Sequence, residues 1–470
     1  MSSLEISSAQ LHRLAEHITT MAEEYLGSLD SRPSFPPAAG VETERLFHIT
    51  LPEQGIGEAA LSELEQVVRF SRAQNGRFFG YVLGSGEPVS ALADLLASIL
   101  NQNVTAWRSA PAAVTIERTV VQWLAQAIGC GHFSGSLTGG GSAVNLMALA
   151  MAREASIPSN ERGLHANPQA MVYASDQVHM SIPKAVALLG VGREHLRLVR
   201  TDDSYRMIPA ELERAILQDE KSGKILMAVV ASAGTVNTGA IDDLTEVARI
   251  ARSHGAWFHV DGAYGALAAI AVPQKFKGLN LADSISLDPH KWLYQPLDCG
   301  CLLYRDSAAA RTAFAHTGDY AKALSTDPVE GFAFFEESLE LSRRFRALKL
   351  WLSVRYHGIA AFRNAIQKDL DHAQRLAAAI RNHPELELLA PVELSALCFR
   401  YKGAAGQNEE DLNHLNAEIL RRVVQRGRVY LSNASLRGKF CLRACIVNHR
   451  TTDADIDAIV PEVLAAATSI

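Results

Sequence analysis

Residues 225–262 read ILMAVVASAGTVNTGAIDDLTEVARIARSHGAWFHVDG, and this stretch decides the fold class. It opens with an apolar run at 225–232 and closes with a second one at 256–262. Between them, LTEVARIARSHG at 244–255 has its apolar residues at helical spacing. Strands that are apolar on both faces and are joined through a helix are typical of a parallel sheet that is covered on both sides. The stretch therefore predicts a strand–helix–strand unit.

Comparable apolar runs, each bounded by turn residues, recur on both sides of this unit. They are AMVYAS (170–175), SISLD (284–288) and CLLY (301–304). Helical and strand-like segments alternate from about residue 57 to 340, which predicts an α/β fold built on a mostly parallel sheet flanked by helices. In such sheets ligands gather at the carboxyl ends of the strands, so the functional residues are expected there.

The two ends of the chain differ in sequence pattern from this central part. Residues 8–30 carry apolar side chains at helical spacing, and the prolines of SRPSFPPAAG (31–40) break any helix that follows. After about residue 365 the segments suggest a smaller unit, which closes with a helix that has Thr452 or Asp453 as its N-cap. We predict a helical arm and connector at 1–56, a large α/β domain at 57–364 and a small α+β domain at 365–470.

Composition argues against several classes of function. The 470 residues carry a net charge of −6 without a basic surplus, which argues against nucleic acid or an anionic membrane as partner. No apolar run reaches the roughly 18 residues that span a bilayer, and the N-terminus lacks the pattern of a secretory signal. The six cysteines form no C-x-x-C pair, so we expect buried free thiols and no metal site. A cytoplasmic location is the resulting expectation.

The first chemical signal is SLTGGGSAVNLMALAMAR at 136–153, where three glycines and a serine precede good helix formers. Glycine lets the backbone approach a ligand closely, and the N–H groups at a helix start favour an anion such as phosphate. The stretch fits neither the dinucleotide fingerprint nor the P-loop. In isolation, a plain loop before a helix is an equally good interpretation.

Two further signals lie at the ends of expected strands. WFHVDGAYGA (257–266) delivers Asp261 directly before a glycine, as a charge that faces a ligand or as a loop cap. SISLDPHKW (284–292) delivers Lys291 among apolar and aromatic neighbours, where a lysine can act as an amine nucleophile. A surface lysine whose stem lies over Trp292 is the alternative for Lys291.

Together the three stretches meet the needs of one cofactor, pyridoxal 5′-phosphate (PLP). A glycine-rich turn can hold its phosphate, Lys291 can form a Schiff base with its aldehyde, and Asp261 can pair with its pyridine nitrogen. That pairing keeps the ring protonated, so that it can act as an electron sink for a carbanion. The order of the stretches along the chain, with about 30 residues between Asp261 and Lys291, suits this arrangement.

Over nearly its whole length the chain resembles the fold-type-I PLP enzymes, and among them the group II amino-acid decarboxylases. The sharpest stretches are TGGGSAVNL (138–146), ASDQVHMS (174–181), HVDGAYG (259–265), DPHKW (288–292) and RRFRALKLW (343–351). The resemblance implies a mostly parallel seven-stranded sheet, α-decarboxylation of an L-amino acid to its amine and CO₂, and a homodimer with active sites at the subunit interface. Aromatic substrates are favoured, and glutamate is disfavoured because no arginine can be placed to bind a distal carboxylate.

Matching the family motifs position by position gives an expected set of site residues. Lys291, His179 and Asp261 are implied to be catalytic, with His179 stacked on the PLP ring and near the departing carboxylate. The cofactor-binding set is Gly140, Gly141, Ser142, His179, Thr235, Asp261, Ala263, His290 and Lys291. The implied substrate contacts are Tyr81, Thr105, Trp107 and Phe334.

One position departs from the family pattern. Many members carry a mobile-loop tyrosine that protonates Cα, and Phe334 aligns with it, while Tyr320 is the nearest tyrosine upstream. A phenyl ring has no proton to donate, so His179 or a water would have to supply it. In plant relatives, phenylalanine here accompanies conversion of amino acids to aldehydes with consumption of oxygen. An aldehyde synthase is therefore the alternative function.

An aminotransferase is a weaker alternative. These enzymes share the fold and cofactor and usually hold the α-carboxylate with an arginine near the C-terminus, a role that Arg443 could fill. The DPHKW and ASDQVH stretches favour a decarboxylase instead. Thr105 stands where aromatic-type decarboxylases have a phenylalanine from the neighbouring subunit, which weakens an aromatic preference without excluding it.

Overall fold

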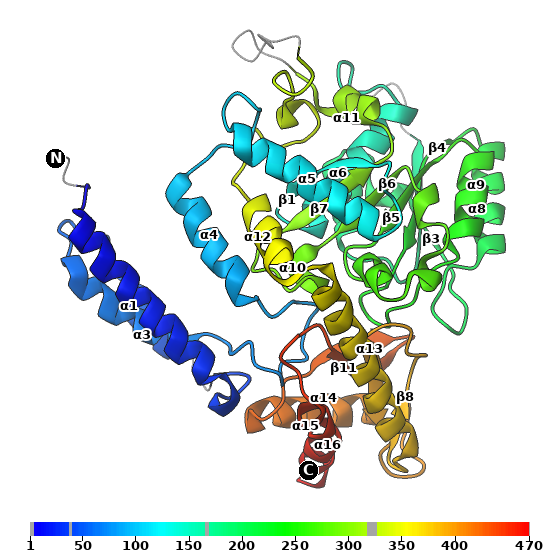
Figure 1. Ribbon diagram of the computed structural model, residues 1–470. Helices are drawn as coiled ribbons and strands as arrows, with labels where there is room; N and C mark the ends of the chain where they lie inside the picture. The colour runs from blue at the N-terminus through cyan, green and yellow to red at the C-terminus, as the bar shows by residue number, and fades with distance from the viewer. Residues whose placement is uncertain (1–3, 37–39, 165–168, 317–326, 470) are drawn as a thin grey trace. The chain divides into compact units, whose positions relative to one another are not determined.

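A computed structural model describes residues 4–36, 40–164, 169–316 and 327–469 (Figure 1). The chain divides into two compact units. The first comprises Met1–Gly80, Tyr401–Leu442 and Arg450–Ile470, and the second comprises Tyr81–Arg400 and Arg443–His449. The larger sheet and the cavity described below belong entirely to the second unit.

In the described residues, the larger sheet has seven strands in the order β1-β7-β6-β5-β4-β2-β3. Strand β7 is antiparallel to its neighbours β1 and β6, and the pairs from β6 through β5, β4 and β2 to β3 are parallel. The strands are β1 (Ser134–Thr138), β2 (Ala170–Ser175), β3 (Leu196–Val199), β4 (Ile225–Ser232), β5 (Trp257–Asp261), β6 (Ser284–Leu287) and β7 (Gly300–Tyr304). The predicted seven-stranded, mostly parallel sheet is confirmed.

The second unit contains most of the helices. Their bounds are α4 (Pro88–Leu100), α5 (Pro111–Ala127), α6 (Gly141–Ser156), α7 (Ser181–Leu188), α8 (Pro209–Lys221), α9 (Leu244–Ser253), α10 (Pro289–Trp292), α11 (Ser307–Phe314), α12 (Ala347–His357) and α13 (Ile359–Asn382). The stretch that opened the sequence analysis forms β4, α9 and β5, as its apolar pattern predicts.

Helices cover both faces of the sheet (Figure 1). Successive side chains of a strand point to opposite faces of the sheet, so each strand packs against helices on both sides. Met171 and Tyr173 of β2 join a buried cluster with residues of α5, α8 and α9. Val172 and Ala174, which alternate with them, join a second cluster with residues of α6 and α7. Burial on both faces explains why β2 and β4 are almost continuously apolar in sequence.

The remaining elements come from the two ends of the chain. They are α1 (Ser8–Gly27), α2 (Gly40–Phe47), α3 (Leu64–Phe70), α14 (Glu409–Arg426), α15 (Asp453–Asp457), α16 (Ile459–Thr468), β8 (Leu386–Leu388), β9 (Ala396–Tyr401), β10 (Ser432–Leu436) and β11 (Lys439–Cys445). The short sheet has the order β10-β11-β9-β8. Thr452 is the N-cap of α15, one of the two residues predicted for that role.

The predicted three-part division of the chain stays a prediction. Its boundary at residue 365 lies inside α13, a continuous helix from Ile359 to Asn382. The change in sequence pattern that suggested the boundary therefore falls inside one continuous helix.

All six cysteines are buried and free, as expected from their spacing. In the described part of the chain, no helix is both long and apolar enough to cross a bilayer. The same residues contain no group of three or more His, Cys, Asp or Glu side chains that could hold a metal ion.

A fully buried ion pair ties the start of the RRFRALKLW stretch to the core of the second unit. Arg343 pairs with Glu117 of α5, and both side chains are almost completely shielded from solvent. The Arg343 guanidinium also donates to the carbonyl oxygens of Val104 and Leu137, each at 2.7 Å. The ring of Phe334 lies against the same guanidinium, with 4.2 Å from its centroid to Cζ. This arginine thus joins three segments that are distant in sequence.

We predict that Arg343→Met destabilises the protein strongly, because the Glu117 carboxylate is left buried without its cation. Breaking a buried pair in this way costs about 3–5 kcal/mol. The measurement is the midpoint of urea-induced unfolding, followed by tryptophan fluorescence. Arg249→Met on α9 is the matched control, since Arg249 pairs with Glu246 in an exposed position. Equal midpoints for the two variants would contradict the prediction.

Candidate active site

A cavity of about 760 Å³ opens where the strands of the larger sheet end. Most of the lining residues lie at the ends of β1, β2, β4, β5 and β6 or within a few residues after them, which is the expected place for a ligand in a parallel sheet. Predicted site residues that line it are Tyr81, Gly140, Gly141, Ser142, His179, Thr235, Asp261, Ala263, His290 and Lys291. The fold thus brings the whole predicted cofactor set into one cavity.

The glycine-rich turn is packed so closely that larger residues could not replace its glycines. Gly140 has φ 139°, in the region that favours glycine, and it directly precedes α6. A Cβ on Gly141 would lie 2.8 Å from the Ala263 Cβ, and a Cβ on Gly300 of β7 would lie 2.4 Å from the Gly140 Cα. The backbone is therefore exposed to the cavity at the start of α6, where N–H groups and the helix dipole favour an anion.

Lys291 lies in the short helix α10, next to an acid and a histidine. Its Nζ is 2.9 Å from Asp288 Oδ2, and His290 Nε2 is 3.6 Å from the same oxygen. His290 Nδ1 donates to the Cys299 carbonyl oxygen at 2.7 Å. Burial lowers the pKa of His290, although Asp288 opposes the shift, so the imidazole is neutral near pH 7.

Asp261 is buried at the end of β5 and is held by three donors. The Asn145 amide donates to Oδ2 at 3.0 Å, and the Ser286 hydroxyl donates to Oδ1 at 2.9 Å. The Ala263 backbone N–H also approaches Oδ1, at 3.3 Å. These three hydrogen bonds fix the orientation of the carboxylate at the cavity.

His179 and Thr235 approach the cavity from the loops after β2 and β4. His179 Nδ1 is 2.9 Å from the Ser181 hydroxyl at the start of α7, and the Thr235 hydroxyl is 2.8 Å from that of Thr238. Burial lowers the pKa of His179, and the nearby Asp261 partly offsets the effect. Both side chains are thus held in place by local hydrogen bonds.

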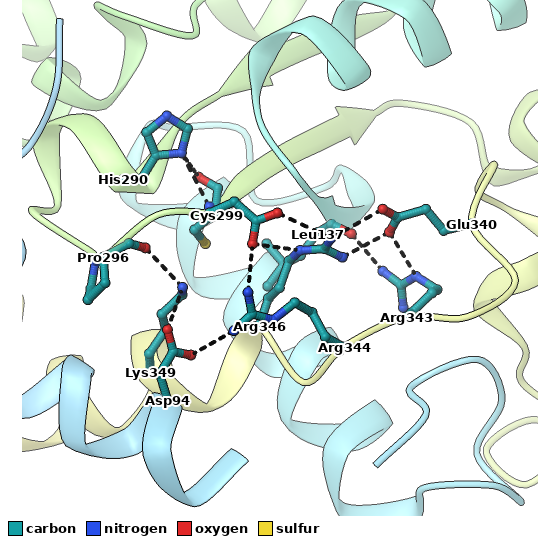
Figure 2. Close-up of polar contacts among 11 residues, drawn as sticks. Asp94, Leu137, His290, Pro296, Cys299, Glu340, Arg343, Arg344, Arg346 and Lys349 are labelled. Atoms are coloured by element: carbon teal, nitrogen blue, oxygen red, sulfur yellow. Dashed lines mark hydrogen bonds and ion pairs between the residues drawn. The ribbon is translucent and has the colours of Figure 1, made fainter. Parts of the chain in front are cut away.

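The turn between α10 and β7 is clamped by the RRFRALKLW stretch, and Figure 2 shows several of the contacts. Lys349 is completely buried and donates to the Pro296 carbonyl oxygen at 2.9 Å and to Asp94 Oδ2 at 3.0 Å. Arg346 donates to both carboxylate oxygens of Asp298, each at 3.3 Å. Burial alone would raise the pKa of Asp298, but the hydrogen bonds and charge of Arg346 lower it below its ordinary value. The clamp fixes the turn that carries Cys299.

The residues present fit a phosphate-bearing aldehyde. Asp288 Oδ1 is buried and has no hydrogen-bond partner among the described residues, and it lines the cavity beside the only lysine among the lining residues. The glycine turn offers N–H groups to an anion, and Asp261 offers a carboxylate to a protonated ring nitrogen. An amine, an anion cradle and a buried carboxylate around one cavity are what PLP requires.

Three predicted substrate residues, Thr105, Trp107 and Phe334, do not line this cavity. They lie together elsewhere, because residues 105–107 run beside residues 332–335. The Trp107 N–H donates to the Phe332 carbonyl oxygen at 3.0 Å, and the Phe335 N–H donates to that of Thr105 at 3.3 Å. Phe334 is fully buried against Arg343. Their predicted role at a substrate site stays a prediction, and Tyr320 lies outside the described residues.

The cavity also contains residues that motif reasoning did not select. Asn145, Asp288, Met180 and Leu297 all line it, and so does Arg443, which the sequence analysis names only for the aminotransferase alternative. Asn145 and Asp288 stand inside quoted motifs, one helical turn after the glycine turn and three residues before the lysine, and that spacing could have identified them. Met180 directly follows His179 inside the ASDQVHMS stretch, whereas Leu297 carries no sequence signal, because only the folded chain places it at the cavity.

This fold and this site define a fold-type-I PLP-dependent enzyme. The family described as the pyridoxal-dependent decarboxylase conserved domain matches residues 47–402. The chain therefore belongs to the pyridoxal-dependent decarboxylases, and it is a PLP-dependent carboxy-lyase that acts on amino acids.

Individual relatives agree with this assignment. The chain is 32% identical to an aromatic-L-amino-acid decarboxylase of Bacillus atrophaeus over 99% of this chain and 97% of the relative. It is 31% identical to a phenylacetaldehyde synthase of Petunia hybrida, over 79% of this chain and 77% of the relative. A crystal structure of Oryza sativa TDC with PLP and tryptamine superposes with a TM-score of 0.93 at 27% identity, covering 100% of this chain and 99% of the other.

We predict that Asp298→Asn weakens PLP binding by about tenfold, which corresponds to about 1.4 kcal/mol. Loss of the charge removes the ion pair between Asp298 and Arg346, which keeps only its pair with Glu340, and loosens the turn whose Cys299 carbonyl holds His290. Titration of the PLP-free protein with PLP, followed by visible absorbance, gives the dissociation constant. Asp306→Asn is the control, because asparagine also serves as an N-cap for α11. An unchanged dissociation constant in Asp298→Asn would refute the role of the clamp.

Proposed function

We propose that the protein decarboxylates an aromatic L-amino acid to its amine and CO₂. The observation that carries the substrate class is the apolar rim of the cavity. Tyr81, Met180 and Leu297 line the cavity and are exposed there, and Val82 adds a further apolar side chain. Exposed apolar side chains around a concave site favour an apolar ligand.

The distribution of charge supports the same substrate class. Arg443 is the only arginine among the residues that line the cavity, and its Nη1 donates to the Val236 carbonyl oxygen at 2.9 Å. A single arginine could serve the α-carboxylate, which every amino acid carries. An acidic side chain on the substrate would need a second cation, and the lining residues offer only Lys291, whose amine is required for the cofactor.

The residues divide the work in a simple way. The turn at Gly140–Ser142 and His290 would hold the cofactor phosphate, Lys291 would bind its aldehyde, and Asp261 would hold its ring nitrogen. Bound PLP supplies an electron sink for the electrons of the breaking Cα–carboxylate bond. Asp288 orients the Lys291 amine at 2.9 Å, and neutral His179 presents a polar edge to the cavity without adding charge.

The aldehyde-synthase alternative rests on Phe334 and on the similarity to a phenylacetaldehyde synthase. The buried ring of Phe334 lies over Arg343 and carries no transferable proton. His179 lines the cavity next to Asp261 and Lys291, and burial lowers the pKa of its imidazole. If His179 protonates Cα efficiently, the amine is the product.

A homodimer in the cytoplasm is part of the proposal. Helix α4 carries a stripe of exposed apolar side chains, Leu92, Leu95, Leu96, Ile99 and Leu100, at helical spacing. Its other side packs on α12 through the Lys349–Asp94 pair. A stripe of this kind on a soluble chain favours a protein partner, and the six free thiols suit a reducing compartment.

The first experiment is a product assay of the PLP-loaded protein with a panel of L-amino acids. We expect CO₂ and amine in equal amounts, fastest with an aromatic amino acid, because the cavity rim is apolar. CO₂, amine, aldehyde and hydrogen peroxide are followed together, with Lys291→Ala as the inactive control. Aldehyde and peroxide in place of amine would establish the alternative function.

The dimer is tested by sedimentation velocity of the Leu92→Glu/Leu96→Glu variant. We expect the mass to fall from about twice the chain's 51.0 kDa to that of one chain, because two carboxylates interrupt the apolar stripe. Leu217→Glu, an exposed leucine on α8, is the control. A double variant that stays dimeric would show that α4 is not at the interface.

A further inference from the structure

A chain of hydrogen bonds beside the cavity connects Asp261 with His179. Its members come from four elements: His259 on β5, Asn145 on α6, Ser181 at the start of α7 and Ser284 on β6. All four side chains are buried. Buried polar groups must be satisfied by partners, so the donors and acceptors of this network can be assigned from chemistry.

The assignment starts at Asp261. The Asn145 amide has one end 3.0 Å from Asp261 Oδ2 and the other end 3.0 Å from His259 Nε2. A carboxylate only accepts hydrogen bonds, so the NH₂ end of Asn145 faces Asp261 and the oxygen end faces His259. His259 must then donate from Nε2.

The other side of the His259 ring agrees with this orientation. Nδ1 lies 2.9 Å from the Ser284 hydroxyl and 3.2 Å from the Ser284 carbonyl oxygen, and only the hydroxyl can donate to it. The Trp257 indole N–H in turn donates to that hydroxyl at 2.8 Å. Burial lowers the pKa of His259 to about 4, although Asp261 opposes the shift, so the ring is neutral and has one proton to place.

The second N–H of Asn145 determines the state of His179. It donates to the Ser181 hydroxyl oxygen at 2.8 Å, so the hydroxyl proton of Ser181 is free to point at His179 Nδ1, 2.9 Å away. The Ser181 backbone N–H approaches the same Nδ1 at 3.3 Å. Two donors converge on Nδ1, which therefore accepts, and a neutral His179 carries its proton on Nε2.

We propose that Asn145 is a positioning residue which, through Ser181, holds His179 as the Nε2–H tautomer while it also holds the Asp261 carboxylate. The Asn145 amide would thus fix two things. It would orient the Asp261 carboxylate that pairs with the ring nitrogen, and it would determine that the His179 proton facing the cavity is on Nε2. The proposal rests on the proposed function only in assigning His179 a part in the reaction. The tautomer itself follows from the hydrogen bonds.

The arrangement also resists protonation of His179. An imidazolium would need Nδ1 to donate, and Nδ1 faces the hydroxyl and the backbone N–H of Ser181. The charged groups around the ring are Asp261 on β5, Lys184 on α7, and Asp288 and Lys291 at the end of β6 and in α10. Asp261 and Asp288 favour the imidazolium, while Lys184 and Lys291 disfavour it. Removal of the Ser181 hydroxyl should therefore raise the pKa of His179.

The test compares Ser181→Ala with Ser181→Thr, which keeps the hydroxyl. Protein labelled with ¹⁵N-histidine reports which ring nitrogen of His179 is protonated, and a His179→Gln variant identifies the signal. We expect an Nε2–H signal in the wild type and in Ser181→Thr, and a mixture of tautomers in Ser181→Ala. An Nδ1–H signal for His179 in the wild type overturns the proposal, and this spectrum needs no substrate.

Kinetics supply the second measurement. With whichever amino acid releases CO₂, we expect Ser181→Ala to lose kcat on the order of tenfold and to move the acidic limb of its pH profile to higher pH. Ser181→Thr should restore both. Ser353→Ala, another fully buried serine, is the control for folding and PLP affinity. An unchanged pH profile together with an unchanged His179 signal in Ser181→Ala would overturn the proposal, whatever the substrate is.

Discussion

The burial of the Asp261 carboxylate is the constraint on which the rest of the site depends. A charge removed from water needs donors with good geometry, and Asp261 obtains them from Asn145 on α6, Ser286 on β6 and its own turn. These elements can meet only if α6 crosses the sheet next to β5 and β6. The close approaches at Gly140 and Gly141 allow α6 to do so, and they leave its N-terminus open to an anion.

The RRFRALKLW stretch supports the same site through the backbone segments next to it. Arg343 is bound to Glu117 and to the Leu137 carbonyl at the end of β1, while Arg346 and Lys349 hold the turn before β7. The glycine turn follows β1, and Gly300 of β7 packs on it. Residues far from the cavity therefore fix the backbone that a phosphate would contact. This explains why a strongly basic segment is buried in a chain that carries net negative charge.

The histidines in and near the cavity are neutral and add no positive charge. Burial lowers the pKa values of His179, His259 and His290, although a carboxylate lies near each of them. Near pH 7 the cavity thus contains lysine, aspartates and polar neutral rings, with few positive charges to bind an acidic side chain. The apolar rim and the neutral imidazole are the features on which the proposed preference for an aromatic amino acid rests.

The sequence by itself determined the mostly parallel sheet and the cofactor, and its motifs selected a predicted cofactor-binding set that lines one cavity, because these depend on local signals. Apolar runs define β4 and β5, glycines define the turn before α6, Asp261 ends β5, and Lys291 lies in α10 shortly after β6. Only the tertiary structure decided which distant residues support them. Asn145, Ser181 and His259 meet because α6, α7 and β5 pack together, and no spacing along the chain records that contact. Phe334 likewise aligned with a loop tyrosine, yet its ring is buried over Arg343, since packing in three dimensions, not the alignment, sets where a side chain points.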